Sequence, residues 1–169
     1  MNNNHFKKED VLVRYSELED GVFIEKWLNE PGVLRGFPLK REAEIKDAVK
    51  YWINFSQYKS SLTAEVSGRI CGVATLNLMP YVKLCHHCLI SIIVGEEFRN
   101  RGIGTILLNN LLHLAKNIFK LEVVYLEVYE GNPAISLYKR FGFKEVGFQK
   151  HFVKENDEYI GKITMERIL

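Results

Sequence analysis

The stretch that is most informative about the fold reads Val94-Gly95-Glu96-Glu97-Phe98-Arg99-Asn100-Arg101-Gly102-Ile103-Gly104. It leaves an apolar segment typical of a strand and enters a segment with helical periodicity. The first backbone N–H groups of such a helix have no intrahelical partner, and together with the helix dipole they favour an anion. Gly102 and Gly104 let the backbone approach a phosphate closely, and Arg99 and Arg101 add positive charge. The pattern therefore predicts a phosphate or pyrophosphate site at a helix N-terminus.

The spacing of the glycines excludes two other phosphate-binding patterns. The chain lacks G-x-x-x-x-G-K-[ST], which marks a P-loop, and G-x-G-x-x-G, which marks a dinucleotide-binding fold. The remaining alternative is a glycine-rich turn with solvated arginines and no ligand. Because the turn lies between a predicted strand and a predicted helix, the binding site is favoured over that alternative.

Hydrophobic periodicity predicts the elements on both sides of this turn. Helices are expected over residues 20–29, 42–55, 103–119 and 133–141, and strands over residues 11–15, 62–66, 70–78, 83–94, 123–128, 144–152 and 159–168. The order is β-α-α-β-β-β-α-β-α-β-β. The strands on either side of the third helix need a crossover and should be parallel, whereas the hairpins should be antiparallel. We expect an α/β fold with one mixed, twisted β-sheet and helices on both faces.

Length and composition fit one domain. The chain has 169 residues, of which 47% are hydrophobic and 26% charged, and this suffices for a packed core. We expect a flexible N-terminal segment over residues 1–10 and a single domain over residues 11–169. The formal net charge of +2 is too small to indicate a nucleic-acid or membrane partner. Three cysteines, an odd number, and the absence of a signal-peptide pattern favour a reducing, cytoplasmic setting.

Two motifs resemble those of the GNAT superfamily of N-acetyltransferases. Arg99-x-x-Gly102-x-Gly104 is similar to the family's acetyl-CoA pyrophosphate motif. Ala134-Ile135-Ser136-Leu137-Tyr138-Lys139-Arg140-Phe141-Gly142-Phe143 resembles its A-I-x-L-Y-x-x-x-G-F signature. The two motifs occur in the family's order, one strand apart, and the predicted element order also matches. The carboxyl-terminal half most resembles small bacterial amino-acid and amine N-acetyltransferases, whereas the amino-terminal half gives no clear match.

The resemblance implies acetyl-CoA as cosubstrate and assigns residues to it. Ile92, Ile93 and Val94 would hold the pantetheine arm by backbone pairing, in the gap where their strand splays from its parallel neighbour. The pyrophosphate would lie against Arg99, Asn100, Arg101, Gly102, Ile103, Gly104 and Thr105. Tyr138 would be the general acid that protonates the leaving coenzyme A thiolate. Asn132 would be a further cofactor contact, although the family commonly has its asparagine at the position of Gly131.

An amine nucleophile must lose a proton, and Glu127 is the leading candidate for the general base. It lies in Leu126-Glu127-Val128, where some relatives carry a catalytic glutamate. A charge within an apolar strand is costly unless it is paired or functional. The alternative is a solvated glutamate at an edge. Weaker candidates are His86, His87, Ser91 and Tyr129, and ordered water could replace a dedicated base.

The segment Cys85-His86-His87-Cys88 raises a metal hypothesis that the spacing does not support. A zinc site of this kind needs a second pair of ligands, and strand positions three apart face opposite sides. We therefore predict no metal. By analogy with the family, the loop 30–39 and the helix 42–55 should line the acceptor side. Phe37, Trp27 and Trp52 could shape a pocket there or belong to the core, and Glu30 and Glu44 could attract a cationic amine.

These features together predict an acetyl-CoA-dependent N-acetyltransferase that acts on the primary amine of a small molecule, such as an amino acid or a polyamine. The amine would attack the thioester directly in a ternary complex, since no Cys or Ser sits in a nucleophile arrangement. Alternatives are a protein N-terminal or lysine acetyltransferase and a non-catalytic acyl-CoA-binding module. A homodimer through a strand edge at residues 159–168 is also compatible with the sequence.

Overall fold

The computed structural model describes residues 8–169, in which seven strands form one sheet. The strand order is β1-β2-β3-β4-β5-β7-β6, and neighbouring strands are antiparallel except for β4 and β5. The predicted flexible segment 1–10 falls mainly outside the described residues, and Lys8–Asp10 form a short 3-10 helix. The strands are β1 Val11–Tyr15, β2 Ser61–Val66, β3 Arg69–Leu78, β4 His87–Val94, β5 Val123–Tyr129, β6 Lys144–Glu155 and β7 Glu158–Ile168.

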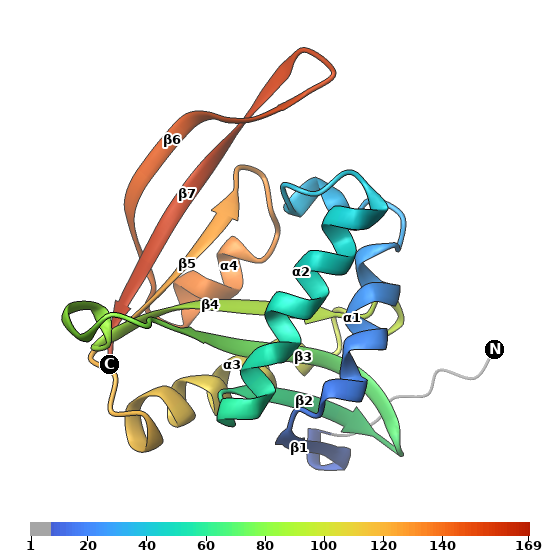
Figure 1. Cartoon of the computed structure of the whole chain (residues 1–169), viewed down its shortest axis with the longest axis vertical. Helices are drawn as coiled ribbons and strands as arrows, with labels where there is room; N and C mark the ends of the chain where they lie inside the picture. Colours follow the sequence, from blue (N-terminus) through green and yellow to red (C-terminus); the bar gives the residue numbers. More distant parts are fainter. Residues whose placement is uncertain (1–7) are drawn as a thin grey trace.

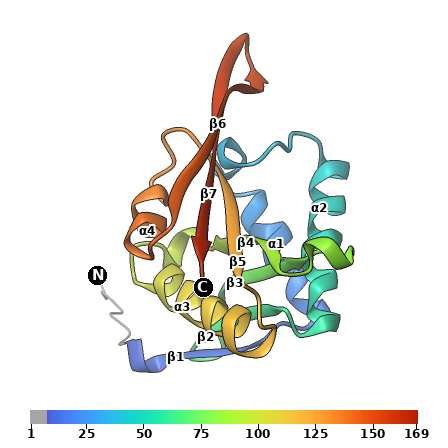
Figure 2. The same cartoon turned by 90° about the vertical axis from the view of Figure 1, so that its left-hand side faces the viewer.

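Within residues 8–169, four α-helices cover the two faces of the sheet (Figures 1 and 2). The helices are α1 Gly21–Leu28, α2 Glu42–Asn54, α3 Ile103–His113 and α4 Ile135–Arg140. α1 and α2 pack on one face, and α3 and α4 pack on the other. The predicted order of elements and the mixed sheet with helices on both faces are confirmed. α3 ends earlier than predicted and continues as a π-helical turn, Leu114–Ile118.

The hydrophobic residues form two cores, one on each face of the sheet, because successive side chains of a strand point to opposite faces. Val124, Leu126 and Val128 of β5 are buried against α3 and α4. Tyr125 and Glu127 therefore point toward the face of α1 and α2. The smaller core on that face consists of Ile24, Trp27, Leu28, Ile45, Val49, Ile53, Val73 and Ile93.

Two elements begin later than predicted. β4 begins at His87 rather than at residue 83, because the chain forms a 3-10 turn, Val82–Leu84, after Pro80. α4 begins at Ile135, so that Pro133 precedes the helix instead of occupying its first turn. Both differences concern segments next to a proline, where local periodicity defines an element's end poorly.

The β6–β7 hairpin projects beyond the rest of the molecule (Figure 1). Its strands extend further toward the tip than predicted, because Asn156 and Asp157 both take positive φ, 48° and 65°, as a two-residue hairpin turn requires. β7 lies between β5 and β6. The prediction of a free strand edge at residues 159–168 is therefore wrong, and the edge on this side of the sheet is β6.

β4 and β5 separate soon after they meet. Their parallel ladder in the described chain consists of three pairs, His87 with Val123, Cys88 with Val124 and Leu89 with Tyr125. β4 then continues to Val94 beside β3, and β5 continues to Tyr129 beside β7. The backbone N–H and C=O groups of β4 beyond Leu89 that face β5 are not used by this ladder. The two strands thus form a V-shaped slot that opens toward their carboxyl ends.

Gly95, directly after β4, packs its backbone against the indole of Trp27. A Cβ at Gly95 would collide with Trp27 Nε1, and the indole is 2% exposed. We expect Gly95→Ala to lower the free energy of unfolding by about 1–3 kcal/mol, because the buried ring has little room to move. Urea denaturation would measure the loss. Gly147→Ala is the control, since its Cβ would lie 3.8 Å from Thr164 Cβ, and an equal loss in both variants would contradict the steric explanation.

Candidate active site

The predicted anion-binding turn lies between β4 and α3. Asn100 and Gly102 both have positive φ, 58° and 87°, and Gly102 is the N-cap residue of α3. The helix then starts at Ile103, and the Ile106 N–H donates to Gly102 O at 3.0 Å. The first turn of α3 keeps the N–H groups that every helix start leaves without intrahelical partners. Together with the helix dipole, these groups can hold an anion such as a phosphate.

The two sequence motifs meet where α3 and α4 touch. A Cβ at Gly104 would lie 3.5 Å from Leu137 Cδ2, in ordinary contact. The next residue, Tyr138, is 8% exposed and packs edge to face on Phe143, with ring centroids 6.0 Å apart. Burial raises the pKa of Tyr138 to about 12, so the phenol keeps its proton at neutral pH. A protonated phenol beside the turn is suited to donate a proton.

Arg99 braces the turn through two contacts. Its Nε donates to Val94 O at 3.0 Å, and its Nη2 donates to Glu30 Oε2 at 2.9 Å. Glu30 also accepts a hydrogen bond from the backbone N–H of Glu96 at 3.0 Å. The sequence suggested Glu30 as an attraction for a cationic amine, but the carboxylate instead ties the loop after α1 to the turn before α3. No local sequence signal could have revealed this pair, because its members are 69 positions apart.

Ile92, Ile93 and Val94 form the β4 side of the slot. On the side of β3 they pair with Ala74, Val73 and Gly72. Ile93 packs into the core of α1 and α2, and Ile92 and Val94 pack into the core of α3 and α4. Their other backbone edge faces the side from which β5 has separated. This edge is the arrangement that an extended, amide-containing arm needs in order to pair with a strand.

Asn132 lies between β5 and α4, where it starts the turn into the helix. Its Oδ1 accepts a hydrogen bond from the Ala134 N–H at 2.9 Å, and its backbone O accepts one from the Ile135 N–H at 3.2 Å. A Cβ at Gly36 would lie 3.5 Å from Asn132 Nδ2. The loop between α1 and α2 therefore reaches the start of α4 as well as the turn before α3.

Glu127 stands where β4 and β5 separate, two residues beyond Tyr125, the last β5 residue paired with β4. Its side chain is 40% exposed, and Lys162 Nζ donates to Glu127 Oε1 at 2.7 Å. The same ammonium lies 3.9 Å from the ring centroid of Phe152. The carboxylate is thus neither buried without a partner nor simply solvated. Sequence reasoning missed Lys162 as a residue of this site. Its contact with Glu127 depends on the pairing of β7 with β5, and no local pattern in the sequence reveals that pairing.

The other base candidates are less suited to that role. Tyr129 Oη and His87 Nδ1 are buried and have no hydrogen-bond partner within residues 8–169. Burial, and then the nearby charge of Glu127, raise the pKa of Tyr129 to about 12, so its phenolate is scarce at neutral pH. Ser91 Oγ accepts a hydrogen bond from Asn77 Nδ2 at 2.9 Å, which fixes it within the sheet.

The cysteines and histidines around the start of β4 do not converge. Cys85 is exposed in the turn before the strand, so it is not a strand residue as predicted, whereas Cys88 is buried in the core of α3. His86 and His87 contact each other edge to face at 4.8 Å. Among residues 8–169, no group of three or more His, Cys, Asp or Glu side chains is arranged to hold a metal ion.

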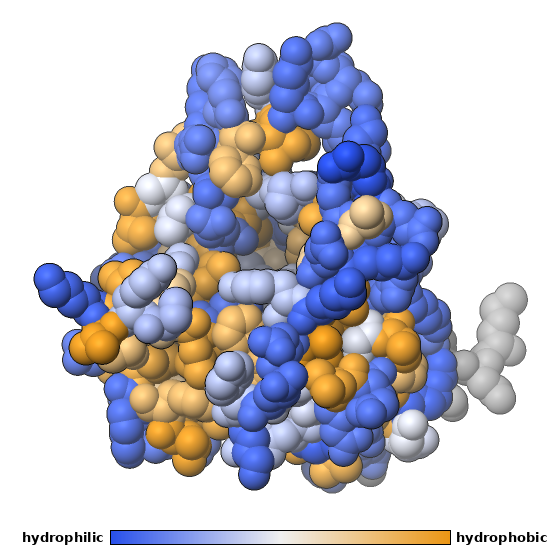
Figure 3. All heavy atoms as spheres, in the orientation of Figure 1, coloured by the Kyte–Doolittle hydropathy of each residue, from blue (hydrophilic) through white to orange (hydrophobic). Residues whose placement is uncertain are grey.

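A cavity of about 300 Å³ lies beside the loop that the sequence predicted to line the acceptor side. It is bounded by the end of α1, the loop that follows and the tip of the β6–β7 hairpin, and its lining includes Glu30, Arg35 and Glu155. The space-filling view shows the surface hollowed between the hairpin and the helices on this side (Figure 3). The hairpin tip and the α1–α2 loop therefore lie on opposite sides of this cavity.

The aromatic and acidic residues that the sequence suggested for the acceptor side occupy different parts of the structure. Phe37 and Trp52 pack edge to face at 5.7 Å at the loop, whereas Trp27 belongs to the core. Glu44 caps the start of α2. Hydrogen bonds led by the Arg41 N–H lower the pKa of Glu44 to about 2. Glu44 therefore serves the helix start rather than an acceptor amine.

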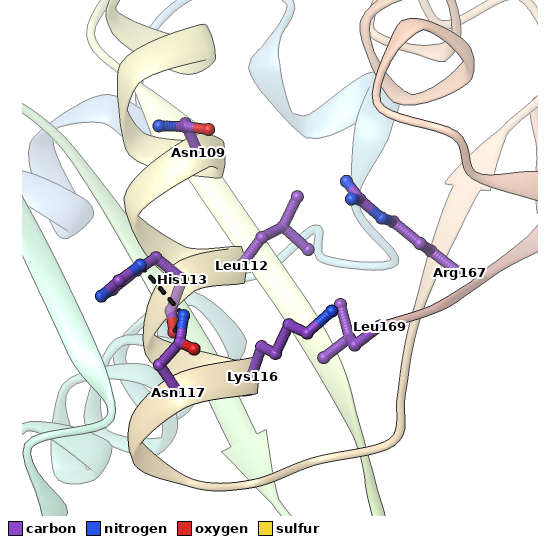
Figure 4. A pocket seen from close by; sticks show the side chains of 7 residues that line it. All are labelled: Asn109, Leu112, His113, Lys116, Asn117, Arg167 and Leu169. Atoms are coloured by element: carbon purple, nitrogen blue, oxygen red, sulfur yellow. Dashed lines mark hydrogen bonds between the residues drawn. The ribbon is translucent and has the colours of Figure 1, made fainter.

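A second cavity, of about 220 Å³, lies at the end of α3 that is far from the anion-binding turn (Figure 4). Arg167 donates to Phe141 O at 2.6 Å beside it, and Asn117 Nδ2 lies 3.0 Å from His113 Nδ1. The lining residues are Asn109, Leu112, His113, Lys116, Asn117, Arg167 and Leu169. This lining includes none of the predicted site residues, so the cavity is separate from the candidate active site.

Comparison with known proteins decides the family. The model of the acetyltransferase (GNAT) family matches residues 22–143, which include the slot, the anion-binding turn and Tyr138. The chain belongs to the GNAT acetyltransferase family. An N-alpha-acetyltransferase from Sulfolobus acidocaldarius is 40% identical over 107 residues, which cover 60% of this chain and 63% of that protein. The chain thus matches less than two thirds of that relative's length.

Two further comparisons concern a curated relative and the fold. The L-amino acid N-acetyltransferase AaaT of Escherichia coli is 28% identical over 108 residues, which cover 63% of this GNAT chain and 67% of that protein. The fold matches that of yncA from Salmonella typhimurium, solved with its cofactor acetyl-CoA, with a TM-score of 0.79, 17% identity and 94% coverage of both chains. Among residues 8–169, no helix combines the length and apolarity needed to cross a membrane.

Proposed function

We propose that this GNAT protein transfers the acetyl group of acetyl-CoA to the primary amine of a small molecule. The observation that carries the proposal is the slot where β4 and β5 separate after three pairs. The slot lies beside a helix start capped by Gly102, and the buried, protonated Tyr138 follows Leu137, which lies against Gly104 of that helix.

The residues of the site fit acetyl-CoA. The free edge of Ile92, Ile93 and Val94 would pair with the pantetheine amides. The turn and helix start, from Arg99 to Thr105, would hold the pyrophosphate, with positive φ at Gly102 shaping the cradle. Asn132 would contribute from the start of α4. When bound, acetyl-CoA would supply the thioester that carries the acetyl group.

Two side chains on opposite faces of β5 would move the protons. Glu127, on the face of α1 and α2, would accept the proton that the acceptor ammonium loses. Tyr138, on the face of α3 and α4, would give its phenolic proton to the leaving sulfur. The amine would attack directly in a ternary complex, with no covalent bond to the enzyme.

The size of the acceptor-side cavity supports a small acceptor. A volume of about 300 Å³, with Glu155 of the hairpin in its lining, is at the lower end of small-ligand pockets. The name of the E. coli relative favours an amino acid, and that of the S. acidocaldarius relative favours a protein N-terminus as the second candidate. We also propose a reducing, cytoplasmic setting, because all three cysteines are free.

Binding of acetyl-CoA tests the cofactor assignment, on which the rest of the proposal depends. Isothermal calorimetry should give a dissociation constant in the micromolar range, about −8 kcal/mol. The double variant Arg99→Ala, Gly102→Ala should lose this binding for two reasons. A Cβ at Gly102, where φ is +87°, distorts the anion-binding turn, and the hydrogen bonds from Arg99 that hold this turn are removed. Gly68→Ala, at φ +74° in the β2–β3 turn, imposes a similar strain far from the site and should bind normally.

Either of two results would count against this assignment. No binding by the intact protein would overturn the cofactor, and equal loss in Gly68→Ala would show that the effect is on the fold. If the intact protein binds acetyl-CoA, a screen of amino acids, polyamines and N-terminal peptides by free-thiol release would identify the acceptor. Turnover confined to peptides would overturn the small-molecule assignment and support the protein N-terminus.

A further inference from the structure

Lys162 places a primary amine of the chain itself beside the proposed base. Its Nζ lies 2.7 Å from Glu127 Oε1 and 3.9 Å from the ring centroid of Phe152, and its side chain is 14% exposed. A carboxylate and an aromatic face are the two groups that hold an ammonium ion well. Lys162 therefore fills a formed site for a primary amine.

This amine site adjoins the slot. Glu127 follows closely after the last pair between β4 and β5, and it points to the face of α1 and α2. Leu126 and Val128, on either side of it, belong to the core on the opposite face, which also contains Tyr138. A thioester in the slot would have the proton donor on one face and the pair of Glu127 and Lys162 on the other.

We propose that Lys162 is a self-acetylation site that receives the acetyl group when no better acceptor is present. The inference rests on the function proposed above. Glu127 takes one proton from the Lys162 ammonium, and the freed lone pair forms the new N–C bond with the thioester carbonyl carbon. The C–S bond breaks, Tyr138 protonates the sulfur, and the remaining excess proton on nitrogen restores Tyr138. The products are a neutral amide at Lys162, free coenzyme A and the proton held by Glu127.

Self-acetylation would change the site itself. The amide carries no charge, so the ion pair with Glu127 and the contact of a cation with the Phe152 ring are both lost. An external amine that competes for Glu127 should in turn protect Lys162. The modification is therefore coupled to the supply of acceptor.

Lysine reactivity in the full-length protein tests the proposal, with Lys154 as the matched control. Lys154 lies on β6 of the same hairpin, is 57% exposed and pairs with Asp157 at 3.0 Å. With acetyl-CoA and no acceptor, peptide mass mapping should show Lys162 acetylated at least about tenfold faster than Lys154, because proximity outweighs exposure. With acetic anhydride and no coenzyme A, the order should reverse, since the chemical reagent reaches the exposed amine first. Tyr138→Phe should slow only Lys162, and only in the acetyl-CoA reaction.

The outcomes separate this inference from the proposed function. If calorimetry shows no binding of acetyl-CoA, both are overturned. If the protein binds acetyl-CoA and acetylates an added amine while Lys154 still reacts faster than Lys162, only the self-acetylation is overturned. If Lys162 is acetylated first but no added amine is, the self-acetylation stands and the small-molecule acceptor is overturned.

Discussion

Tyr138→Phe should lower kcat by about 10²-fold to 10⁴-fold, the usual contribution of a positioned general acid. The substitution removes only the phenolic oxygen, so the ring keeps its contact with Phe143 and the core of α3. Because burial raises the pKa of Tyr138 to about 12, the wild-type phenol stays protonated up to and beyond its ordinary value of 10.0. The phenol loses its proton only as the pH rises through its pKa of about 12. A decline in kcat that begins well below this pH would therefore report the titration of another group. Thiol release at saturating acetyl-CoA measures the effect.

Tyr129→Phe is the matched control for this prediction. Tyr129 is also buried, its pKa is also raised to about 12, and it lies on the opposite face of β5 from Tyr138. Its replacement should change kcat far less than that of Tyr138. Calorimetry should show that both variants still bind acetyl-CoA. Full turnover in Tyr138→Phe, or a larger loss in Tyr129→Phe, would show that the acid has been assigned to the wrong residue.

Asp20→Asn should lower the free energy of unfolding by about 1.5–3 kcal/mol, the range for hydrogen bonds to a charged group. Asp20 is 2% exposed and accepts hydrogen bonds from Arg14 Nη1 and Nη2 at 2.8 and 2.9 Å. It also accepts from the Glu17 N–H at 2.9 Å and from Thr63 Oγ1 at 2.7 Å. Asparagine has no charge and offers one acceptor oxygen instead of two, so Arg14 would lose its paired hydrogen bonds to Asp20 and keep only its contact with Glu65 Oε1 at 2.6 Å among carboxylates. Urea denaturation measures the loss.

The same pair predicts a dependence on pH. Burial alone would raise the pKa of Asp20, but the hydrogen bonds from Arg14, Glu17 and Thr63 outweigh it and hold the pKa below 3.8. The folded pKa lies below the unfolded one, so this stabilisation is complete above the unfolded value and is lost as the pH falls through the folded value. The gap between wild type and Asp20→Asn should therefore shrink in acid.

The control for Asp20 is Glu42→Gln, which removes a surface ion pair with Lys46 on α2. The Glu42 side chain is 78% exposed, so its replacement should leave stability unchanged. Equal stability of the two variants would show that the buried pair of Asp20 and Arg14 contributes no more than a surface pair.

The amino-acid sequence was sufficient for the features that depend on near neighbours. The turn before α3 follows from the spacing of Gly102 and Gly104, and the parallel pair of β4 and β5 follows from the crossover helix between them. The assignment of Tyr138 to a proton donor came from the motif around it, and its burial agrees with that role. Boundaries were less certain beside Pro80 and Pro133, where a turn interrupts the periodic pattern.

Only the tertiary structure decided which distant side chains meet. Glu30 and Arg99 are 69 positions apart, and Glu127 and Lys162 are 35 positions apart, yet each pair is joined by a hydrogen bond. Local patterns specify which face of a strand a residue occupies, but the strand order and register determine what lies opposite. The sequence by itself therefore determined the order of the elements and the mixed sheet, and its motifs indicated the family and the candidate cofactor residues. The partners of Arg99 and Glu127 depended on the order β4-β5-β7 and on the path of the loop after α1, because these bring together segments that no local periodicity relates.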